Sequence, residues 1–185
     1  MGRCFNGVGE NLINKRDDLV NRFKEEIIKH QIDSIEFVKS LNALSEKEWR
    51  TQIEDGKWTV AEIIGHFKPW DEFILHERLP YLFSEHELPK GPESGKTNAE
   101  SATISRAEKQ QVTIDKFISS RKELYKAIVE IPNDRWAEKF SIGNTTLSLY
   151  EYFRGLAQHD HHHFDQIKNS IHLEERGNPF NFRTP

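Results

Sequence analysis

Apolar residues recur at steps of three and four along most of this 185-residue chain, which is the spacing of one buried face of an α-helix. Four such stretches predict helices over residues 14–44, 59–74, 98–131 and 148–171. A connection rich in proline and glycine, residues 87–97, separates the second helix from the third. No stretch alternates apolar and polar residues for long, so strands should be few or absent. The pattern therefore predicts an all-α four-helix bundle.

Capping residues mark where two of these helices begin. Thr59 with Glu62 and Ser148 with Glu151 match the capping box, in which each residue's side chain hydrogen-bonds the backbone N–H of the other. Pro69 falls inside the second helix and cannot donate a backbone hydrogen bond, so we expect it to bend or break that helix.

The ends of the chain lack helical periodicity. Asn14 is the expected N-cap of the first helix, and the segment before it contains three glycines and no repeating apolar pattern. Asn98 or Ser101 is the expected cap of the third helix. The predicted organisation is a flexible N-terminal segment, the bundle and a C-terminal tail, over residues 1–13, 14–172 and 173–185.

The two halves of the chain resemble each other at an offset of 87 residues. Tryptophan, glycine and threonine recur at this offset, and helical periodicity does not force such matches. The matching pairs include Ile27 and Ile114, Leu41 and Ile128, Trp49 and Trp136, Gly56 and Gly143, and Thr59 and Thr146. Chance alignment of two amphipathic hairpins is the alternative. A true repeat predicts two equivalent helical hairpins, with the second and fourth helices in matching places.

Composition narrows the class of protein. The net charge is −4 and there is no basic surplus, so neither nucleic acid nor an anionic membrane is an expected partner. No apolar run approaches the roughly 20 residues needed to cross a bilayer, and residues 1–12 lack the apolar core of a signal peptide. We therefore expect a cytoplasmic protein. Cys4 is the only cysteine, so a metal would need nitrogen or oxygen ligands.

A histidine-rich run at residues 159–163 carries the candidate chemistry. His159 and His163 lie one helical turn apart beside the apolar face of the fourth helix, whereas His161 and His162 point away from it. Two imidazoles on one helix hold a divalent ion weakly, so a third ligand is needed, and His66 on the second helix is the candidate. A solvated helix face that picks up metal adventitiously is the alternative.

Two stretches of the chain resemble the signatures of the DinB/YfiT-like superfamily. Residues 58–66 fit W-[TS]-x-x-E-x-x-x-H, and residues 159–167 fit H-x-x-x-H-x-x-Q-[IL]. The resemblance implies a bundle with up-down-down-up connectivity. It also implies a divalent metal, commonly zinc or nickel, bound by His66, His159 and His163. Pro69 and the tail residues Phe180 and Phe182 have no counterpart in the family pattern.

The resemblance also implies a chemistry, because relatives include S-transferases and isomerases that use low-molecular-weight thiols. Three imidazoles leave positions open on a metal, as in catalytic sites. The leading hypothesis is a metal-dependent, thiol-dependent S-transferase acting on a small electrophile. A metal-dependent hydrolase, with Asp71 or Glu72 as the nearest candidate base, and a non-catalytic protein that binds small molecules are the alternatives. Asp160 is a candidate acceptor for a ligand imidazole, and the sequence leaves monomer and homodimer open.

Overall fold

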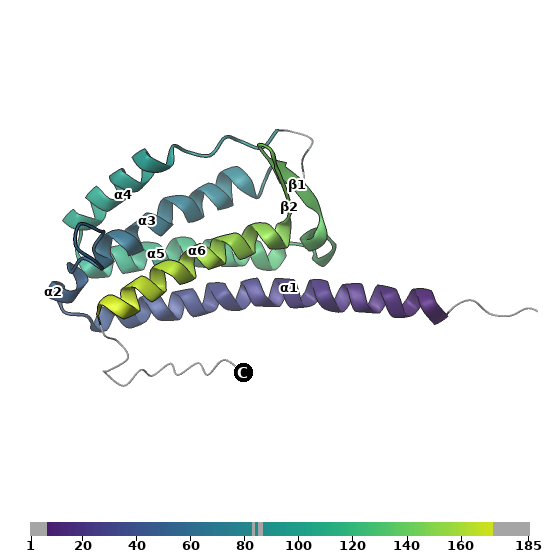
Figure 1. Cartoon of the computed structure of the whole chain (residues 1–185), viewed down its shortest axis with the longest axis horizontal. Helices are drawn as coiled ribbons and strands as arrows, with labels where there is room; N and C mark the ends of the chain where they lie inside the picture. Colours follow the sequence, from purple (N-terminus) through teal and green to yellow (C-terminus); the bar gives the residue numbers. More distant parts are fainter. Residues whose placement is uncertain (1–6, 83, 85–86, 172–185) are drawn as a thin grey trace, which may run out of the picture.

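The fold is a four-helix bundle with up-down-down-up connectivity, as predicted. The computed structural model describes residues 7–82, 84 and 87–171. The bundle consists of α1 (Gly7–Ser40), α3 (Val60–Phe73), α5 (Gln110–Glu130) and α6 (Leu149–Ser170). In Figure 1, α3 and α5 run in one direction, and α1 and α6 run in the opposite direction. None of the described helices has both the length and the apolar character that a bilayer-spanning segment requires.

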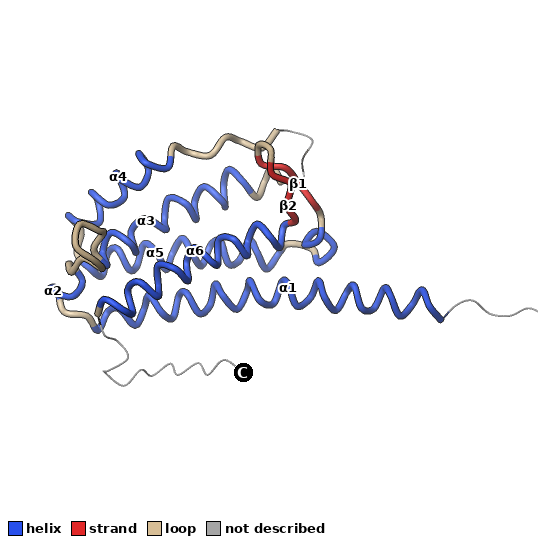
Figure 2. Tube along the Cα trace, in the orientation of Figure 1, coloured by secondary structure: helices blue, strands red, loops and turns tan. Residues whose placement is uncertain are grey.

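Short elements connect the bundle helices (Figure 2). They are 3-10 turns at Leu41–Ala43 and Asn133–Ala137, helix α2 (Glu46–Trp49), a π-helical turn at Ile74–Arg78, helix α4 (Ser94–Ala107), and strands β1 (Lys139–Ile142) and β2 (Thr145–Ser148). The two strands pair antiparallel and lead directly into α6. The prediction that strands are few is therefore confirmed.

The predicted third helix is in fact two helices, α4 and α5. Glu108 adopts an extended conformation between them and ends α4. Helix α4 begins before the expected caps Asn98 and Ser101, because the Glu93 carboxylate accepts hydrogen bonds from the backbone of Gly95 and Lys96 at 2.8 and 2.6 Å. Apolar periodicity continues across the break, which is why the sequence pattern did not reveal it.

Two other boundaries also differ from the prediction. Helix α1 begins at Gly7 and not at the expected cap Asn14. Pro69 does not break α3, which continues to Phe73 and then widens into the π-helical turn Ile74–Arg78. The backbone donor that Pro69 lacks is therefore tolerated inside this helix. The predicted C-terminal tail, residues 173–185, lies outside the described residues.

The internal repeat is visible in the structure. Trp49 and Trp136, one from each half, are both fully buried. Gly56 and Gly143 have φ angles of 73° and 57°, the left-handed region that favours glycine. Each pair therefore has the same structural role in its half of the chain.

The repeat changes register where the second helix of each half begins. Thr59 and Ser148 are the two N-caps, each in a complete capping box, so the offset becomes 89 residues here. The expected match of Thr59 with Thr146 is therefore wrong by two residues, because the loop of the second half is a longer β-hairpin. At the new offset, Asp71 of α3 corresponds to Asp160 of α6.

These two aspartates share one buried arginine at the centre of the bundle. Arg121 of α5 donates from Nε to Asp71 Oδ2 at 2.8 Å and from Nη1 to Asp160 Oδ2 at 2.5 Å. His30 of α1 donates from Nε2 to the same Asp160 oxygen at 2.9 Å. All four side chains are buried. The cluster therefore connects all four helices of the bundle.

The two carboxyl groups of this cluster differ in pKa. Burial raises the pKa of Asp71 to about 6 against the opposing effect of Arg121. Burial also disfavours the charged form of Asp160, but the charge of Arg121 and the neighbouring His159 and His30 side chains outweigh it and hold the pKa of Asp160 well below its usual range. Asp160 is therefore the firmly ionised member of the pair at neutral pH.

We expect Arg121→Met to lower the free energy of unfolding by about 3–5 kcal/mol at neutral pH, because it leaves two buried carboxyl groups without their cation. Urea denaturation followed by circular dichroism measures the change. Arg135→Met is the matched control, since Arg135 pairs with Glu138 at the surface and its removal should leave the midpoint unchanged. Equal effects of the two variants would contradict a central role for the cluster.

We expect Gly65→Ala to lower the free energy of unfolding by about 1–3 kcal/mol, because a Cβ atom there would collide with the Ser105 side chain where α4 packs on α3. Gly155→Ala is the control, since a Cβ on this exposed helical glycine meets nothing within 4 Å. It should stabilise the protein by about 0.5–1 kcal/mol. Thermal denaturation of both variants measures the two effects. A Gly65→Ala protein that is more stable than the parent would contradict the close packing of α3 on α4 at this position.

Candidate metal centre

His66 offers a buried imidazole nitrogen with no partner. It lies on α3 and is 2% exposed. Its Nδ1 donates to the backbone carbonyl of Ile63 at 2.5 Å, so the lone pair of the neutral ring is on Nε2. That Nε2 is buried without a hydrogen-bond partner. Burial lowers the pKa of His66 to about 3, which keeps the ring neutral at physiological pH.

His163 of α6 is held in the same tautomer. Its Nδ1 lies 2.9 Å from Gln166 Oε1, one turn further along the helix. Because an amide oxygen only accepts, the ring donates from Nδ1 and Nε2 keeps its lone pair. Burial lowers the pKa of His163, and the neighbouring His159 lowers it further. This ring is therefore also neutral and has a free nitrogen.

His159 stands at the rim of the site. Its side chain is 50% exposed, whereas the sequence placed it on or beside the buried face of the helix. Its Nδ1 lies 3.6 Å from Asp160 Oδ1, which is too long for a direct hydrogen bond but within electrostatic reach. Asp160 is fixed through its other oxygen by Arg121 and His30. The predicted role of Asp160 as a hydrogen-bond acceptor for a ligand imidazole therefore stays a prediction, since its observed donors are Arg121 and His30.

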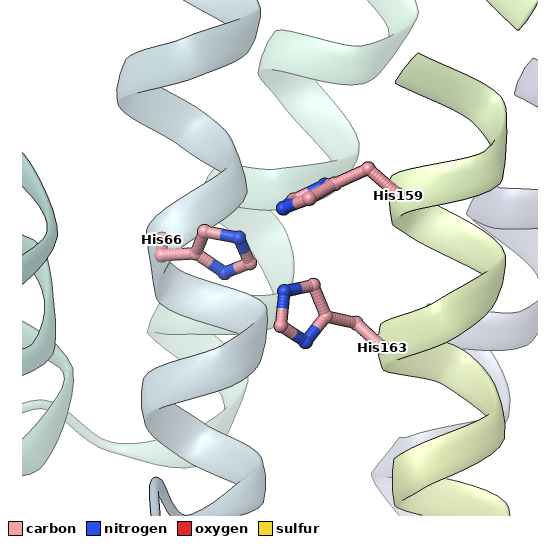
Figure 3. Close-up of side chains that lie close together, drawn as sticks. All are labelled: His66, His159 and His163. Atoms are coloured by element: carbon pink, nitrogen blue, oxygen red, sulfur yellow. The ribbon is translucent and has the colours of Figure 1, made fainter. Parts of the chain in front are cut away.

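The three predicted imidazoles converge on one point between α3 and α6. One ring nitrogen from each of His66, His159 and His163 lies within 4.8 Å of the others. Figure 3 shows the rings facing one another across the two helices. A tetrahedral zinc ion with Zn–N distances of 2.0–2.1 Å holds its nitrogens about 3.3 Å apart. Small side-chain rotations would therefore bring all three nitrogens within bonding distance of one ion.

Aromatic side chains surround the cluster. The ring of Phe67 lies 4.3 Å from that of His66, and the Trp58 ring lies 5.2 Å from it. Phe67 also contacts both histidines of α6, with ring centroids 5.9 and 5.8 Å apart. This apolar wall strengthens electrostatic interactions at the site, because it excludes water from one side.

The carboxylates considered as general bases are engaged elsewhere. Asp71 pairs with Arg121, and Glu72 pairs with Lys68 at 2.5 Å. Among the described residues, His66, His159 and His163 form the group of side chains close enough together to share a metal ion, and no carboxylate belongs to it. His161 and His162 are exposed, as predicted.

The residues that orient the site had no role assigned to them from the sequence. Gln166 lies three positions after His163, a helical spacing that could have identified it. Arg121 and His30 gave no such signal, since they reach Asp160 from positions 39 and 130 residues away. Such contacts become visible only when the helices are packed together.

Comparison with known proteins agrees with this architecture. The solved structure of YfiT from Bacillus subtilis, described as a probable metal-dependent hydrolase with an unusual four-helix bundle topology, superposes with a TM-score of 0.68. The match covers 83% of this chain and 87% of YfiT at 14% sequence identity, so it shows a shared fold. No curated protein matches the chain.

A match to a protein-family model shows which superfamily the chain belongs to. The model of the DinB superfamily matches residues 35–167, well over half of the chain, and this range includes all three histidines of the cluster. The protein is therefore a member of the DinB superfamily.

Proposed function

We propose that this protein is a metal-dependent enzyme in which His66, His159 and His163 hold a divalent ion, zinc or nickel. The observation that carries the proposal is the unpartnered Nε2 of His66, a buried lone pair that faces two further imidazoles. An unsatisfied buried nitrogen costs free energy, and a metal ion would remove that cost. The metal-dependent description of YfiT supports the same assignment.

The protein's own side chains would orient and shield the reacting groups. The Ile63 carbonyl and the Gln166 amide fix two rings with Nε2 directed inward. Phe67 covers the apolar side, while the half-exposed His159 marks the side from which a substrate can approach. A bound divalent ion would supply Lewis-acid chemistry, lowering the pKa of a thiol or a water molecule at its open positions.

We further propose that the nucleophile is a low-molecular-weight thiol, whose sulfur forms a bond to a small electrophile while the leaving group departs with its electron pair. The engagement of Asp71 and Glu72 in ion pairs supports a thiol over water. Without a carboxylate base, a metal-bound thiol would be fully deprotonated at neutral pH, whereas metal-bound water has a pKa of about 7 and would be ionised only in part. Hydrolysis is the second candidate, favoured by the description of YfiT.

We expect untagged protein purified without a metal column to contain about one zinc or nickel ion per chain, and His163→Ala to lose it while keeping its helical fold. Chelation should lower the Tm of the parent protein and leave the Tm of His163→Ala unchanged, because binding to the folded state alone stabilises it. Elemental analysis and thermal scans measure both effects. His162→Ala, an exposed neighbour in the same run, should behave as the parent. Equal metal loss in both variants would indicate adventitious surface binding.

We expect the metal-loaded protein to accelerate conjugation of a thiol such as glutathione or bacillithiol to an aryl halide, and His163→Ala to be inactive. Product formation is followed by absorbance, with 4-nitrophenyl acetate as a parallel hydrolysis substrate. Ester hydrolysis without thiol conjugation would show that the protein is a hydrolase and not a transferase. If neither activity appears and ligand binding survives in His163→Ala, the protein is a non-catalytic binder.

A further inference from the structure

A second arginine is buried in this molecule, and it has no counter-ion among the residues that the structure describes. Arg78 ends the π-helical turn Ile74–Arg78 and is 5% exposed. Its Nη1 donates to the Pro89 carbonyl at 3.2 Å, and its Nε is buried without a partner. Arg121, equally buried, has two carboxylates. Within the described part of the chain, Arg78 is therefore a buried cation without the carboxylate partners that Arg121 has.

Such an arrangement is costly unless an anion completes it. The guanidinium stays charged in any environment, and burying a charge without a partner is strongly unfavourable. The planar fork of arginine matches the two oxygens of a carboxylate, which forms short, charge-assisted hydrogen bonds with it. An orphaned Nε is thus a donor suited to a ligand carboxylate.

The neighbours of Arg78 come from three parts of the fold. Its guanidinium lies 4.9 Å from the ring centroid of Phe73, the last residue of α3. The π-helical turn explains this contact, because residues five apart become neighbours in it. Tyr152 of α6 is adjacent, since Arg78 partly offsets the rise in pKa that burial gives this phenol, through its charge and a side-chain hydrogen bond. Phe73, Tyr152 and Pro89 are each partly exposed, so the surroundings of Arg78 reach the surface.

Both helices that supply the histidines lead to this arginine. Phe73 follows His66 by seven residues on α3, and Tyr152 precedes His159 by seven residues on α6. Seven residues of α-helix span about 10 Å. Because α3 and α6 run in opposite directions, both displacements lead toward the same end of the bundle (Figure 1). Arg78 therefore lies about two helical turns from the histidine cluster.

We propose that Arg78 binds a carboxylate of the thiol substrate, so that this substrate carries an anionic group about 10 Å from its sulfur. The inference rests on the proposed function for the identity of the sulfur end. The anion-binding role of Arg78 rests on its own contacts and can be tested without turnover.

The test measures binding by calorimetry with probes that differ in one group. On the metal-loaded protein, 8-mercaptooctanoate spans the required length, and 8-mercaptooctanol has the same length without the charge. We expect the acid to bind about ten-fold or more tightly than the alcohol. Arg78→Met should abolish this preference, and Arg78→Lys, which keeps the charge but loses the fork, should weaken it. Arg154→Met, at an exposed position on α6, should keep the full preference.

A purely structural arginine predicts a different result. Arg78→Met would then lower the Tm and leave the ratio of the two dissociation constants unchanged. A binding residue predicts an unchanged or higher Tm, because an unpaired buried charge has been removed. Equal or undetectable binding of acid and alcohol by the parent protein, or a preference that survives in Arg78→Met, overturns the proposal.

Binding measurements on metal-free protein test the anion site independently of the proposed transferase activity. Octanoate and octanol lack the sulfur, so a preference for octanoate that disappears in Arg78→Met supports the anion site whether or not the protein conjugates thiols. Failure of the transferase is detected separately, as absence of turnover with the neutral 8-mercaptooctanol on the metal-loaded protein.

Discussion

One buried arginine fixes the arrangement on which the rest of the bundle depends. Arg121 binds Asp71 and Asp160, and His30 joins Asp160, so one side chain from each of α1, α3, α5 and α6 meets at a single point. Ion pairs in an apolar interior constrain geometry strongly, because any displacement leaves a buried charge unpaired. The same cluster holds Asp160 beside His159 and so connects the packing of the bundle to the candidate metal centre.

The two halves of the molecule stop being equivalent at the candidate metal centre. The aspartates that bind Arg121 occupy corresponding positions after their capping boxes, as expected from a repeated hairpin. The histidines do not correspond, since at the same offset His66 matches the exposed Gly155. One half therefore supplies one imidazole and the other supplies two. The two hairpins are related by a repeat, but the histidine site between them is asymmetric. One side of the cluster is open to solvent at the half-exposed His159.

Two buried arginines in one small bundle illustrate how the surroundings of a charge indicate its role. Arg121 has its carboxylates within the protein and contributes to holding the helices together. Arg78 contacts an aromatic ring, a backbone carbonyl and Tyr152, and its Nε is a buried donor without a hydrogen-bond partner. The histidine cluster lies between α3 and α6, and Arg78 contacts Phe73 at the end of α3 and Tyr152 of α6, so both proposed sites involve this pair of helices.

The sequence alone determined what depends on local spacing: the bundle helices, their capping boxes and the pairing of His159 with His163. The choice of His66 as the third ligand did not come from local spacing, and depended on its place in the second helix and on the resemblance to the DinB/YfiT-like signatures. Periodicity and capping involve residues three or four apart, so they are legible in the chain. Only the tertiary structure decided the division of α4 from α5, the engagement of Asp71 by Arg121 and the burial of Arg78 without a carboxylate partner among the described residues. These features depend on contacts between side chains that are tens of residues apart in the sequence. A local sequence pattern cannot predict such contacts.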